Sequence, residues 1–329
     1  MAIAANEKIL TLDYWKRADK LVEGDYIFDR EGVLRRVTLI QHFHSKCYRV
    51  QLSDLMEVSG NGTMRFLLET PKYRKRLIEY KGKRKFLRPL VLSPLSELLN
   101  KSLRHCGDKH FFSIPTCGAL KFPHQDLPVP PFVFGYWYWN RKKPNVFSAR
   151  DLNVKEVLEK FKSHGYEIIK PKRAANGITK FSVFPTIESQ LAPFIPREIP
   201  NNYLLASQEQ RIELLSGIIN AKISQYKKQR DHFRIWSSTW LEIRKMQALV
   251  ESLGCKTTLN FNDVRKYYTL SFKIRHVLCS HQESPPIKVH QSRRYIKQIE
   301  ELPAQQCVHI ETDGPDGSFL VGEGFITCR

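Results

Sequence analysis

Short runs of alternating apolar and polar residues fill the first part of the chain, from residue 7 to about residue 70. Examples are Asp25-Tyr26-Ile27-Phe28 and Tyr48-Arg49-Val50-Gln51-Leu52, and turn signals such as Glu23-Gly24-Asp25 separate the runs. A period of two places successive side chains on opposite faces of a β-strand. We therefore expect a β-rich module at the N-terminal end.

The same pattern returns between Tyr295 and Thr327. Apolar residues alternate in Tyr295-Ile296-Lys297-Gln298-Ile299 and in Cys307-Val308-His309-Ile310-Glu311. Asp313 to Gly317 is typical of a turn, and a hairpin from Phe319 to Ile326 is expected after it. The C-terminal end therefore predicts a second β-rich segment.

Between these two parts the apolar residues follow helical spacing. They recur at intervals of three and four from Asn153 to His164 and from Trp240 to Leu253, and Gly165 and Gly254 follow directly. This spacing predicts amphipathic helices, and glycine is a common residue just past a helix end. The pattern along the whole chain indicates a β module split around an α/β insert.

Length and composition indicate a globular protein of several packed units, because 329 residues at 42% hydrophobic exceed one small core. No stretch reaches the roughly 18 uninterrupted apolar residues that cross a bilayer, and Met1 to Asn6 lacks the features of a secretory signal. The 7 cysteines are odd in number and scattered, which suits a reducing compartment. We expect an intracellular protein, nuclear if the host is a eukaryote, with no membrane partner.

The charge of the chain indicates a class of partner. The formal net charge is +20, and residues 72–109 alone hold twelve Lys and Arg against three acidic residues. Tyr73, Tyr80 and Phe86 are interleaved with these cations. A strongly basic surface favours nucleic acid, since neutralised phosphates release their counterions. The same segment is also compatible with a solvated loop or a nuclear-import signal.

His105, Cys106, His110, Cys117 and His124 gather in a short stretch, but their spacing fits no standard zinc site. We therefore expect no bound metal and no cofactor.

Several blocks of the sequence together suggest a family. The opening carries Ile9-Leu10-Thr11 and then Gly24-Asp25, a second block spans Leu52 to Thr70, and a terminal block spans Cys307 to Arg329. Two apolar segments with a central glycine lie between them, Phe134-Gly135-Tyr136-Trp137-Tyr138-Trp139-Asn140-Arg141 and Leu215-Ser216-Gly217-Ile218-Ile219-Asn220-Ala221-Lys222-Ile223. In this order the blocks resemble inteins that carry an inserted LAGLIDADG (DOD-type) homing endonuclease.

The resemblance implies an α+β multi-domain fold: a Hedgehog/intein (Hint) β-horseshoe split by a two-repeat LAGLIDADG α/β domain. Residues 1–125 would be the N-terminal part of the β domain, with a basic DNA-contact insertion at about 72–109. Residues 126–290 would be the insert, in repeats 126–200 and 201–290, and residues 291–329 would complete the β domain. A chain with two pseudo-symmetric repeats has no need to pair with a copy of itself, so we expect a monomer.

The residues that would splice the protein are replaced. Splicing in the family begins at a Cys or Ser nucleophile, and the matching position here is Ala2. The block that supplies a histidine includes Asn61 and Met64, and a thioether is a poor proton donor. The terminal His-Asn pair is replaced by Cys328 and Arg329. We expect no protein splicing.

The residues that would cut DNA are replaced as well. In the family each motif helix ends in an acidic residue, and the two carboxylates share divalent cations that activate water. The matching residues here are Asn140 and Lys222. An amide is a poor ligand and an ammonium repels a cation. We therefore expect a protein that is not an enzyme and that keeps the frame of a nuclease without its metal site.

The function expected is that of a domesticated protein that binds double-stranded DNA. Basic residues on segments that face DNA in the family form the candidate DNA-binding set: Lys72, Arg74, Lys75, Arg76, Lys83, Arg84, Lys85, Lys170, Lys172, Arg173, Lys180, Lys227, Lys228, Arg230, Arg234, Arg265, Lys266, Lys273 and Arg275.

Three alternatives stay open from the sequence. An active site-specific endonuclease would use shifted acids such as Asp126, Glu209 and Glu213, and it alone would need Mg²⁺. An RNA-binding protein could stack unpaired bases on Trp236 or on Tyr267 and Tyr268. A protein-interaction scaffold would use the positive charge only for solubility.

Overall fold

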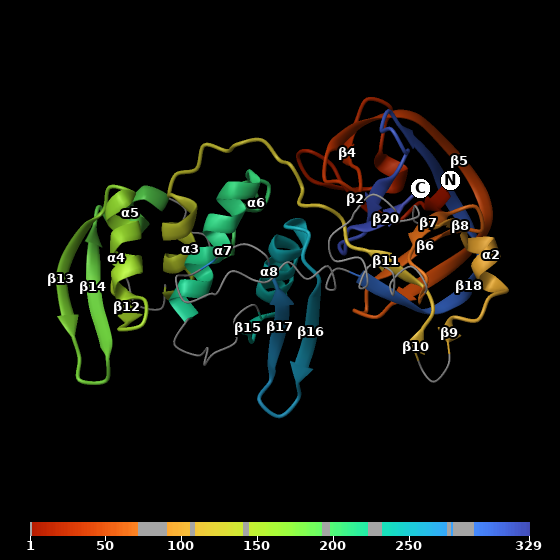
Figure 1. The fold of residues 1–329 in the computed structure, drawn as a ribbon. Coiled ribbons are helices and arrows are strands. Elements are labelled where there is room, and N and C mark those ends of the chain that lie inside the picture. The colour runs from red at the N-terminus through yellow and green to blue at the C-terminus, as the bar shows by residue number, and fades with distance from the viewer. Residues whose placement is uncertain are drawn as a thin grey trace, which may run out of the picture. The chain divides into compact units, whose positions relative to one another are not determined.

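The structure is a computed structural model, and it describes residues 2–71, 91–105, 109–140, 145–192, 198–222, 232–274, 278 and 293–329 (Figure 1). The chain divides into two compact units. The first unit comprises Met1–Lys121, Gly254–Lys256 and Lys288–Arg329. The second comprises Phe122–Leu253 and Thr257–Ile287. Among the described residues, no helix is both long and apolar enough to cross a membrane.

The first unit consists mainly of strands. Its N-terminal strands are β1 (Ala2–Ala4), β2 (Lys8–Leu10), β3 (Trp15–Arg17), β4 (Tyr26–Phe28), β5 (Leu34–Leu52), β6 (Glu57–Asn61), β7 (Arg65–Leu68), β8 (Val91–Pro94), β9 (Arg104–His105), β10 (Lys109–His110) and β11 (Ser113–Pro115). Its C-terminal strands are β18 (Arg293–Thr312), β19 (Phe319–Val321) and β20 (Ile326–Cys328). Among the described residues, the 3-10 helix η1 (Ala18–Lys20) and the short helix α2 (Leu95–Leu99) accompany them.

Two long antiparallel strands, β5 and β18, organise this unit and pair along most of their length (Figure 1). They belong to a six-stranded sheet in the order β11-β18-β1-β6-β5-β4. In this order β1 and β6 lie between β18 and β5, and β18 also pairs directly with β5. Side chains of Val50, Val58, Val308 and Ile310 are buried in its core. The two ends of the chain therefore build one sheet, as their shared β pattern had suggested.

One sequence expectation for this region needs a correction. The pattern suggested separate strands at 295–299 and 307–311, whereas β18 is continuous from Arg293 to Thr312. Pro303 lies where the register to β5 shifts, between Leu302 and Gln305. Proline donates no ladder hydrogen bond and is tolerated at such an irregularity. The long partner strand carries the pairing past the proline, which a local pattern does not reveal.

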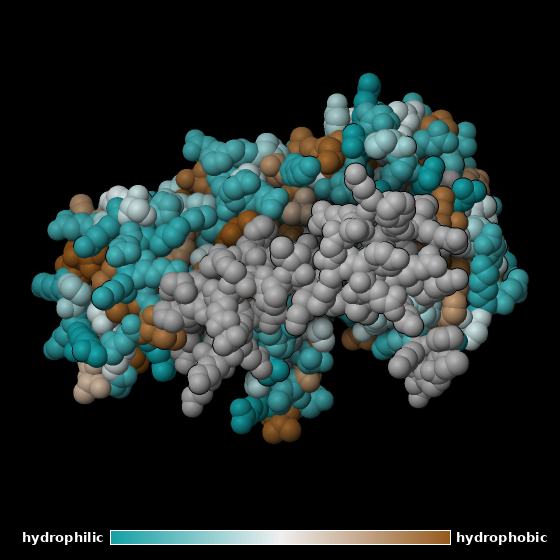
Figure 2. Space-filling model, in the orientation of Figure 1, coloured by the Kyte–Doolittle hydropathy of each residue, from teal (hydrophilic) through white to brown (hydrophobic). Residues whose placement is uncertain are grey.

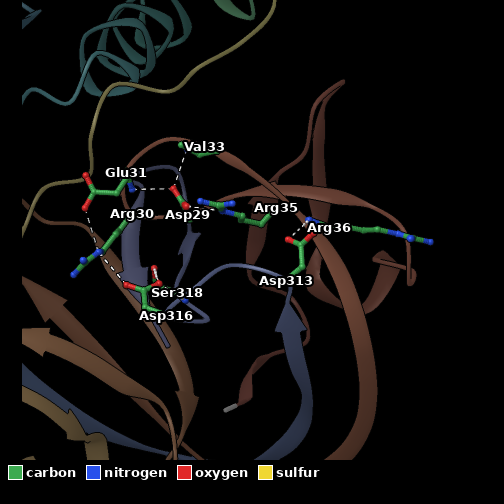
Figure 3. A network of polar contacts seen from close by, with 9 residues as sticks. All are labelled: Asp29, Arg30, Glu31, Val33, Arg35, Arg36, Asp313, Asp316 and Ser318. Atoms are coloured by element: carbon green, nitrogen blue, oxygen red, sulfur yellow. Dashed lines mark hydrogen bonds and ion pairs between the residues drawn. The ribbon is translucent and has the colours of Figure 1, made fainter.

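Two turns of the first unit are joined by the polar network of Figure 3. The buried Asp29 carboxylate accepts hydrogen bonds from the backbone N–H groups of Glu31 and Val33, both at 2.9 Å, and from Arg35 Nε at 2.7 Å. The backbone N–H of Arg36 donates to Asp313 Oδ1 at 2.9 Å.

In the second of these turns, Asp316 accepts from Ser318 and pairs with Arg30 at 3.0 Å. Burial opposes ionisation of Asp316, but these partners outweigh it and lower its pKa. The network ties the expected turn at 313–317 to the N-terminal half of the unit.

The second unit contains the same arrangement twice. Its first half has α3 (Pro131–Asn140), β12 (Phe147–Arg150), α4 (Val154–Ser163), β13 (Glu167–Arg173), β14 (Ile178–Phe184) and α5 (Ile187–Leu191). Its second half has α6 (Asn201–Leu204), α7 (Gln208–Lys222), β15 (His232–Ser237), α8 (Trp240–Ser252), β16 (Thr257–Asn262) and β17 (Tyr267–Lys273). The two three-stranded sheets have the orders β12-β14-β13 and β15-β17-β16, so in each the first strand pairs with the last.

The helices expected from apolar spacing are confirmed. The segment 153–164 is α4, flanked by Asn153 and His164, and the segment 240–253 is α8. Gly165 and Gly254 follow them with φ of +83° and +76°, a backbone conformation that glycine adopts without strain. The two glycine-centred motif segments also lie in helices, α3 and α7.

The helices α3 and α7 pack at very close range through Gly135 and Gly217. A Cβ atom at Gly135 would lie 2.3 Å from the Leu214 carbonyl oxygen, and one at Gly217 would lie 2.1 Å from the Phe132 carbonyl oxygen. Such distances leave no room for any other side chain. These two glycines therefore allow α3 and α7 to approach closely.

We expect Gly217→Ala and Gly135→Ala each to destabilise the protein by about 1–3 kcal/mol, because the added methyl meets backbone that cannot rotate away. Chemical denaturation would measure the loss. Gly62→Ala is the matched control, since its Cβ would have its nearest neighbour at an ordinary 3.5 Å. Equal stability of the Gly217→Ala and Gly62→Ala proteins would contradict the close packing.

Candidate functional sites

The C-terminal ends of α3 and α7 hold Asn140 and Lys222. The sequence resemblance matches these two residues to the metal-binding acids of LAGLIDADG enzymes. The Asn140 side chain donates a hydrogen bond to the Tyr136 carbonyl of its own helix at 3.0 Å. Lys222 is only 2% exposed, and its ammonium donates to the Trp236 carbonyl at 3.0 Å. Both side chains are thus turned to contacts within the protein.

The Lys222 ammonium lies between two indole rings. Its Nζ is 3.7 Å from the centre of the Trp139 ring and 4.3 Å from the centre of the Trp236 ring. Trp139 comes from α3 and Trp236 from β15, so three elements meet at this amine. The faces of indole rings carry negative potential and attract a cation. A lysine charge therefore occupies the region at the end of α7.

Burial and the aromatic contacts act on the charge of Lys222 in opposite directions. Burial lowers its pKa from 10.5 to about 7, and the nearby Glu242 opposes this shift. The two indole rings also favour the charged form. In either protonation state the amine brings no negative charge, so it cannot neutralise a divalent cation as a carboxylate would.

Two of the three acids considered for a shifted nuclease site, Glu209 and Glu213, lie far from the end of α7. Glu209 is in the first turn of α7, and Glu213 precedes Lys222 by nine residues, about 13 Å along the helix axis. Glu213 pairs with Lys160 at 2.8 Å. The contact with His164 at 3.6 Å, followed by Lys160, lowers the pKa of Glu213 to about 2. Among the described residues, no three His, Cys, Asp or Glu side chains are placed to hold a metal ion together.

The residues that match the splicing positions lie in the first unit, on neighbouring strands. Ala2 is fully buried on β1 and pairs with His309 of β18. A Cβ atom at Gly60 would lie 2.6 Å from the Ala2 carbonyl oxygen and 2.7 Å from Met64 Sδ. Ala2 and the fully buried Met64 therefore both approach Gly60, and neither presents a group that attacks or protonates an amide.

The C-terminal residues reach the same region. Arg329 exchanges two backbone hydrogen bonds with Arg65, each 3.0 Å long, directly after Met64. Cys328 is fully buried on β20, where burial and then Glu7 raise the pKa of its thiol. Asn61 uses its side-chain oxygen to accept from the backbone N–H and the hydroxyl of Thr63. A surface pocket there is lined by Thr63, Arg65, His309, Ile310, Glu311, Thr312, Gly317 and Arg329.

Two features near this region were not found by sequence reasoning. Glu7 accepts a hydrogen bond from the Ser59 backbone at 2.7 Å, and burial raises its pKa to about 7. The thiols of Cys47 and Cys307 approach to 3.0 Å, and both are fully buried in a small cluster with Ala2. No local pattern relates these cysteines, because β5 and β18 bring them together from far apart in the chain.

The outward face of the first three-stranded sheet carries basic residues in a row. Buried Thr179, Phe181 and Val183 alternate along β14 with outward residues, which include Lys180. Lys180 pairs with Ser148 on β12 and with Lys172 on β13. Arg150, at the next outward position of β12, belongs to the same face but was missing from the predicted set.

Two other predicted cations of this repeat are placed differently. Arg173 is opposite buried Thr179 and pairs with Asp151 at 2.6 Å, so it lies off the row. Lys170 is exposed and has a φ of +47°, at the irregularity between β13 and β14.

The second sheet carries basic and aromatic residues on its outward face. On β15, buried Phe233 and Ile235 alternate with exposed Arg234 and Trp236. Lys273 lies opposite His232 on the same face. Arg265 and Lys266 are in the turn between β16 and β17, where Figure 2 shows hydrophobic atoms and where Val264 is 92% exposed.

The remaining predicted cations lie outside the described residues. They are Lys72, Arg74, Lys75, Arg76, Lys83, Arg84 and Lys85, which were expected in the basic insertion, and Lys227, Lys228, Arg230 and Arg275 of the second repeat.

No family model matches the chain. It is 22% identical over 234 residues to the replicative DNA helicase DnaB of Mycobacterium intracellulare, and the match covers 67% of this chain and 37% of the helicase. The chain therefore spans little more than a third of that relative's length.

Three solved structures with similarity to the chain are inteins. The MchDnaB-1 intein has a TM-score of 0.30 at 8% identity, with 99% of this chain and 98% of that one covered. The Msm DnaB1 intein splicing domain bound with zinc has a TM-score of 0.32 at 7% identity, with coverage of 99% and 98%. A variant of the Ssp DnaB mini-intein has a TM-score of 0.33 at 8% identity, with coverage of 100% and 97%. The chain is thus similar to these inteins.

The buried amine of Lys222 makes a prediction about stability and pH. Its pKa is about 7 in the folded protein and 10.5 in the unfolded chain, so below pH 7 both states are protonated and burial has its full cost. As pH rises from 7 towards 10.5, the folded state is neutral and this cost declines. Lys222→Met, which keeps an unbranched apolar side chain, should therefore stabilise the protein at pH 6 by an amount on the order of 2 kcal/mol, and by less at pH 9.

Thermal unfolding at both pH values would measure this difference. Lys155→Met on the exposed side of α4 is the control, and it should change stability little at either pH. A loss of stability in the Lys222→Met protein at pH 6 would mean that the aromatic contacts outweigh burial.

Proposed function

We propose that the chain is an intein-derived protein that binds double-stranded DNA and neither splices nor cuts. In this proposal the first unit is a Hint-like splicing domain without its reactive groups. The second unit is a two-repeat LAGLIDADG-like domain without its metal site. The observation that carries the proposal is the repeated arrangement of the second unit, in which both sheets present cations on their outward faces.

Two details of the second unit support descent from a LAGLIDADG nuclease. The helices that meet through Gly135 and Gly217 are the two that carry the motif segments. Each is followed by a strand, a helix and a two-stranded hairpin, and the sheet order is the same in both halves. Helix packing of this closeness depends on glycine and does not depend on the acidic residues. Packing can therefore be retained after the metal ligands have been lost.

The basic row of the first sheet supports binding of a polyanion. Lys172 and Lys180 lie directly opposite each other on neighbouring strands, and like charges in that position destabilise a sheet. Phosphate groups would neutralise them and release counterions. Alternate side chains on a strand point to the same face, so Ser148, Lys180 and Lys172 can meet one ligand together.

Cleavage by shifted acids has less support, because Glu213 is already paired with Lys160 and both Glu209 and Glu213 lie towards the opposite end of α7. A role as a protein scaffold would not require cations to align across strands. RNA binding would use the same charges, and tighter binding to RNA than to DNA would distinguish it from DNA binding.

Binding should be tested with random-sequence duplex DNA in a mobility-shift assay over a series of salt concentrations, and nicking with supercoiled plasmid in Mg²⁺ or Mn²⁺. We expect a shift that weakens steeply with salt and no nicked product. Lys172→Glu with Lys180→Glu should weaken binding at least tenfold, because it reverses two of the proposed phosphate contacts.

The control is Lys155→Glu with Lys162→Glu, which changes the charge equally on exposed positions of α4. This helix packs against β12 and β13 on the face away from the basic row. Equal loss of binding in both double variants would mean that binding depends on net charge alone and that the basic row has no specific role. No binding by the unaltered protein would refute the proposal, and metal-dependent nicking would favour the endonuclease alternative.

The loss of splicing can be tested separately. Placed between two reporter segments, the chain should remain an uncleaved precursor, and it should stay uncleaved when dithiothreitol is added. Ala2→Cys alone should not change this result, because Met64 supplies no proton donor. The comparison is the double variant Ala2→Cys with Met64→His, which places a nucleophile and a proton donor at neighbouring positions. Ligated reporters from the unaltered chain would show that other residues perform the reaction.

A further inference from the structure

The outward face of the second sheet has an aromatic centre that the first sheet lacks. Trp236 occupies an outward position of β15 and is 43% exposed. Its ring lies 6.2 Å from the ring of Tyr267 on β17. The outward residues of the matching strand β12 are Ser148 and Arg150. The two repeats therefore offer different surfaces to a ligand.

The protein holds the Trp236 ring from within. The Lys222 ammonium lies 4.3 Å from its ring centre and donates a hydrogen bond to the Trp236 carbonyl, and Trp139 contacts the same ammonium. Tyr267 packs at an angle beside it. A ring fixed in this way loses little conformational freedom when a ligand stacks on it.

Polar side chains of the kinds that contact nucleotides surround the two rings. Trp236 is opposite Thr269, which is opposite Asn260 on the third strand, and Tyr267 is opposite Asn262. Amide side chains can pair with the edges of bases. Arg234 and Lys273 lie outward on the same face and could meet the adjacent phosphates.

We propose that Trp236 and Tyr267 form a stacking site for an unpaired base of DNA. This inference rests on the proposed function, because it assumes that the sheet faces meet DNA. In an intact duplex each base face is covered by its neighbours, so the indole can stack only where a base is unpaired or turned out. The protein therefore prefers DNA with unpaired bases to fully matched duplex.

The preference can be measured by fluorescence anisotropy with two labelled probes at one salt concentration, a matched duplex and the same duplex with a short central bubble. Stacking on an aromatic side chain should make the bubble probe bind about tenfold more tightly. Trp236→Leu, which keeps apolar bulk without a π face, should remove the preference, so that both probes bind equally. Trp236→Phe should retain most of the preference.

Trp240→Leu is the matched control. Trp240 is 51% exposed, but it begins α8 and its ring packs with Tyr268, which alternates with the outward residues of β17. This substitution should leave the preference intact. Circular dichroism would verify that each variant folds, and Tyr267→Leu serves as a second probe of the site if Trp236→Leu does not fold.

The outcomes separate the two proposals. Equal affinity for both probes, or a preference that survives Trp236→Leu and Tyr267→Leu, overturns the stacking site while DNA binding stands. Tighter binding to single-stranded RNA of the same sequence overturns the assignment to DNA. Failure to bind either DNA probe means that the proposed function itself is wrong.

Discussion

The second unit depends on one steric constraint, the contact of two helix backbones at Gly135 and Gly217. A Cβ atom at either position would lie less than 2.5 Å from a backbone oxygen of the other helix. Because this contact fixes α3 against α7, the end of α3 brings Trp139 to the Lys222 amine at the end of α7. Trp236 on β15 is held by the same amine, so the helix contact also influences the outward face of the second sheet.

In both units, the positions that the sequence resemblance marks as functional hold side chains without the expected reactive group. In the first unit, alanine and methionine are buried at positions where inteins use a nucleophile and a histidine. In the second unit, the resemblance to LAGLIDADG enzymes places the Asn140 amide and the Lys222 amine where those enzymes use acids. Both side chains are packed within the protein: Met64 fills space beside Gly60, and the Lys222 ammonium lies over the faces of two indole rings. Burial of the Met64 thioether is favourable, whereas burial of the Lys222 amine has a cost that the two indole rings offset only in part.

Much of the local structure could be predicted from the sequence. Helical spacing located α4 and α8, and glycines located their ends, because these signals depend on neighbours within one or two turns. The continuous strand β18 was not predicted, since its passage across Pro303 depends on pairing with β5. The proposed DNA contacts were predicted only as a set of cations. Strand register then separated Lys172 and Lys180, which lie in one row, from Arg173, which pairs with Asp151.

The amino-acid sequence was sufficient to show that Ala2, Asn140 and Lys222 stand where the resemblance predicts reactive groups, since residue identity needs no coordinates. It also determined the excess of positive charge and the periodicities of the main elements. The surroundings of individual residues became visible only in the three-dimensional fold. Examples are the tryptophans beside Lys222, the thiol of Cys307 beside Cys47, and the aromatic face beside Arg234. The physical reason is that burial and contact join residues far apart in the chain, whereas periodicity reports only on near neighbours.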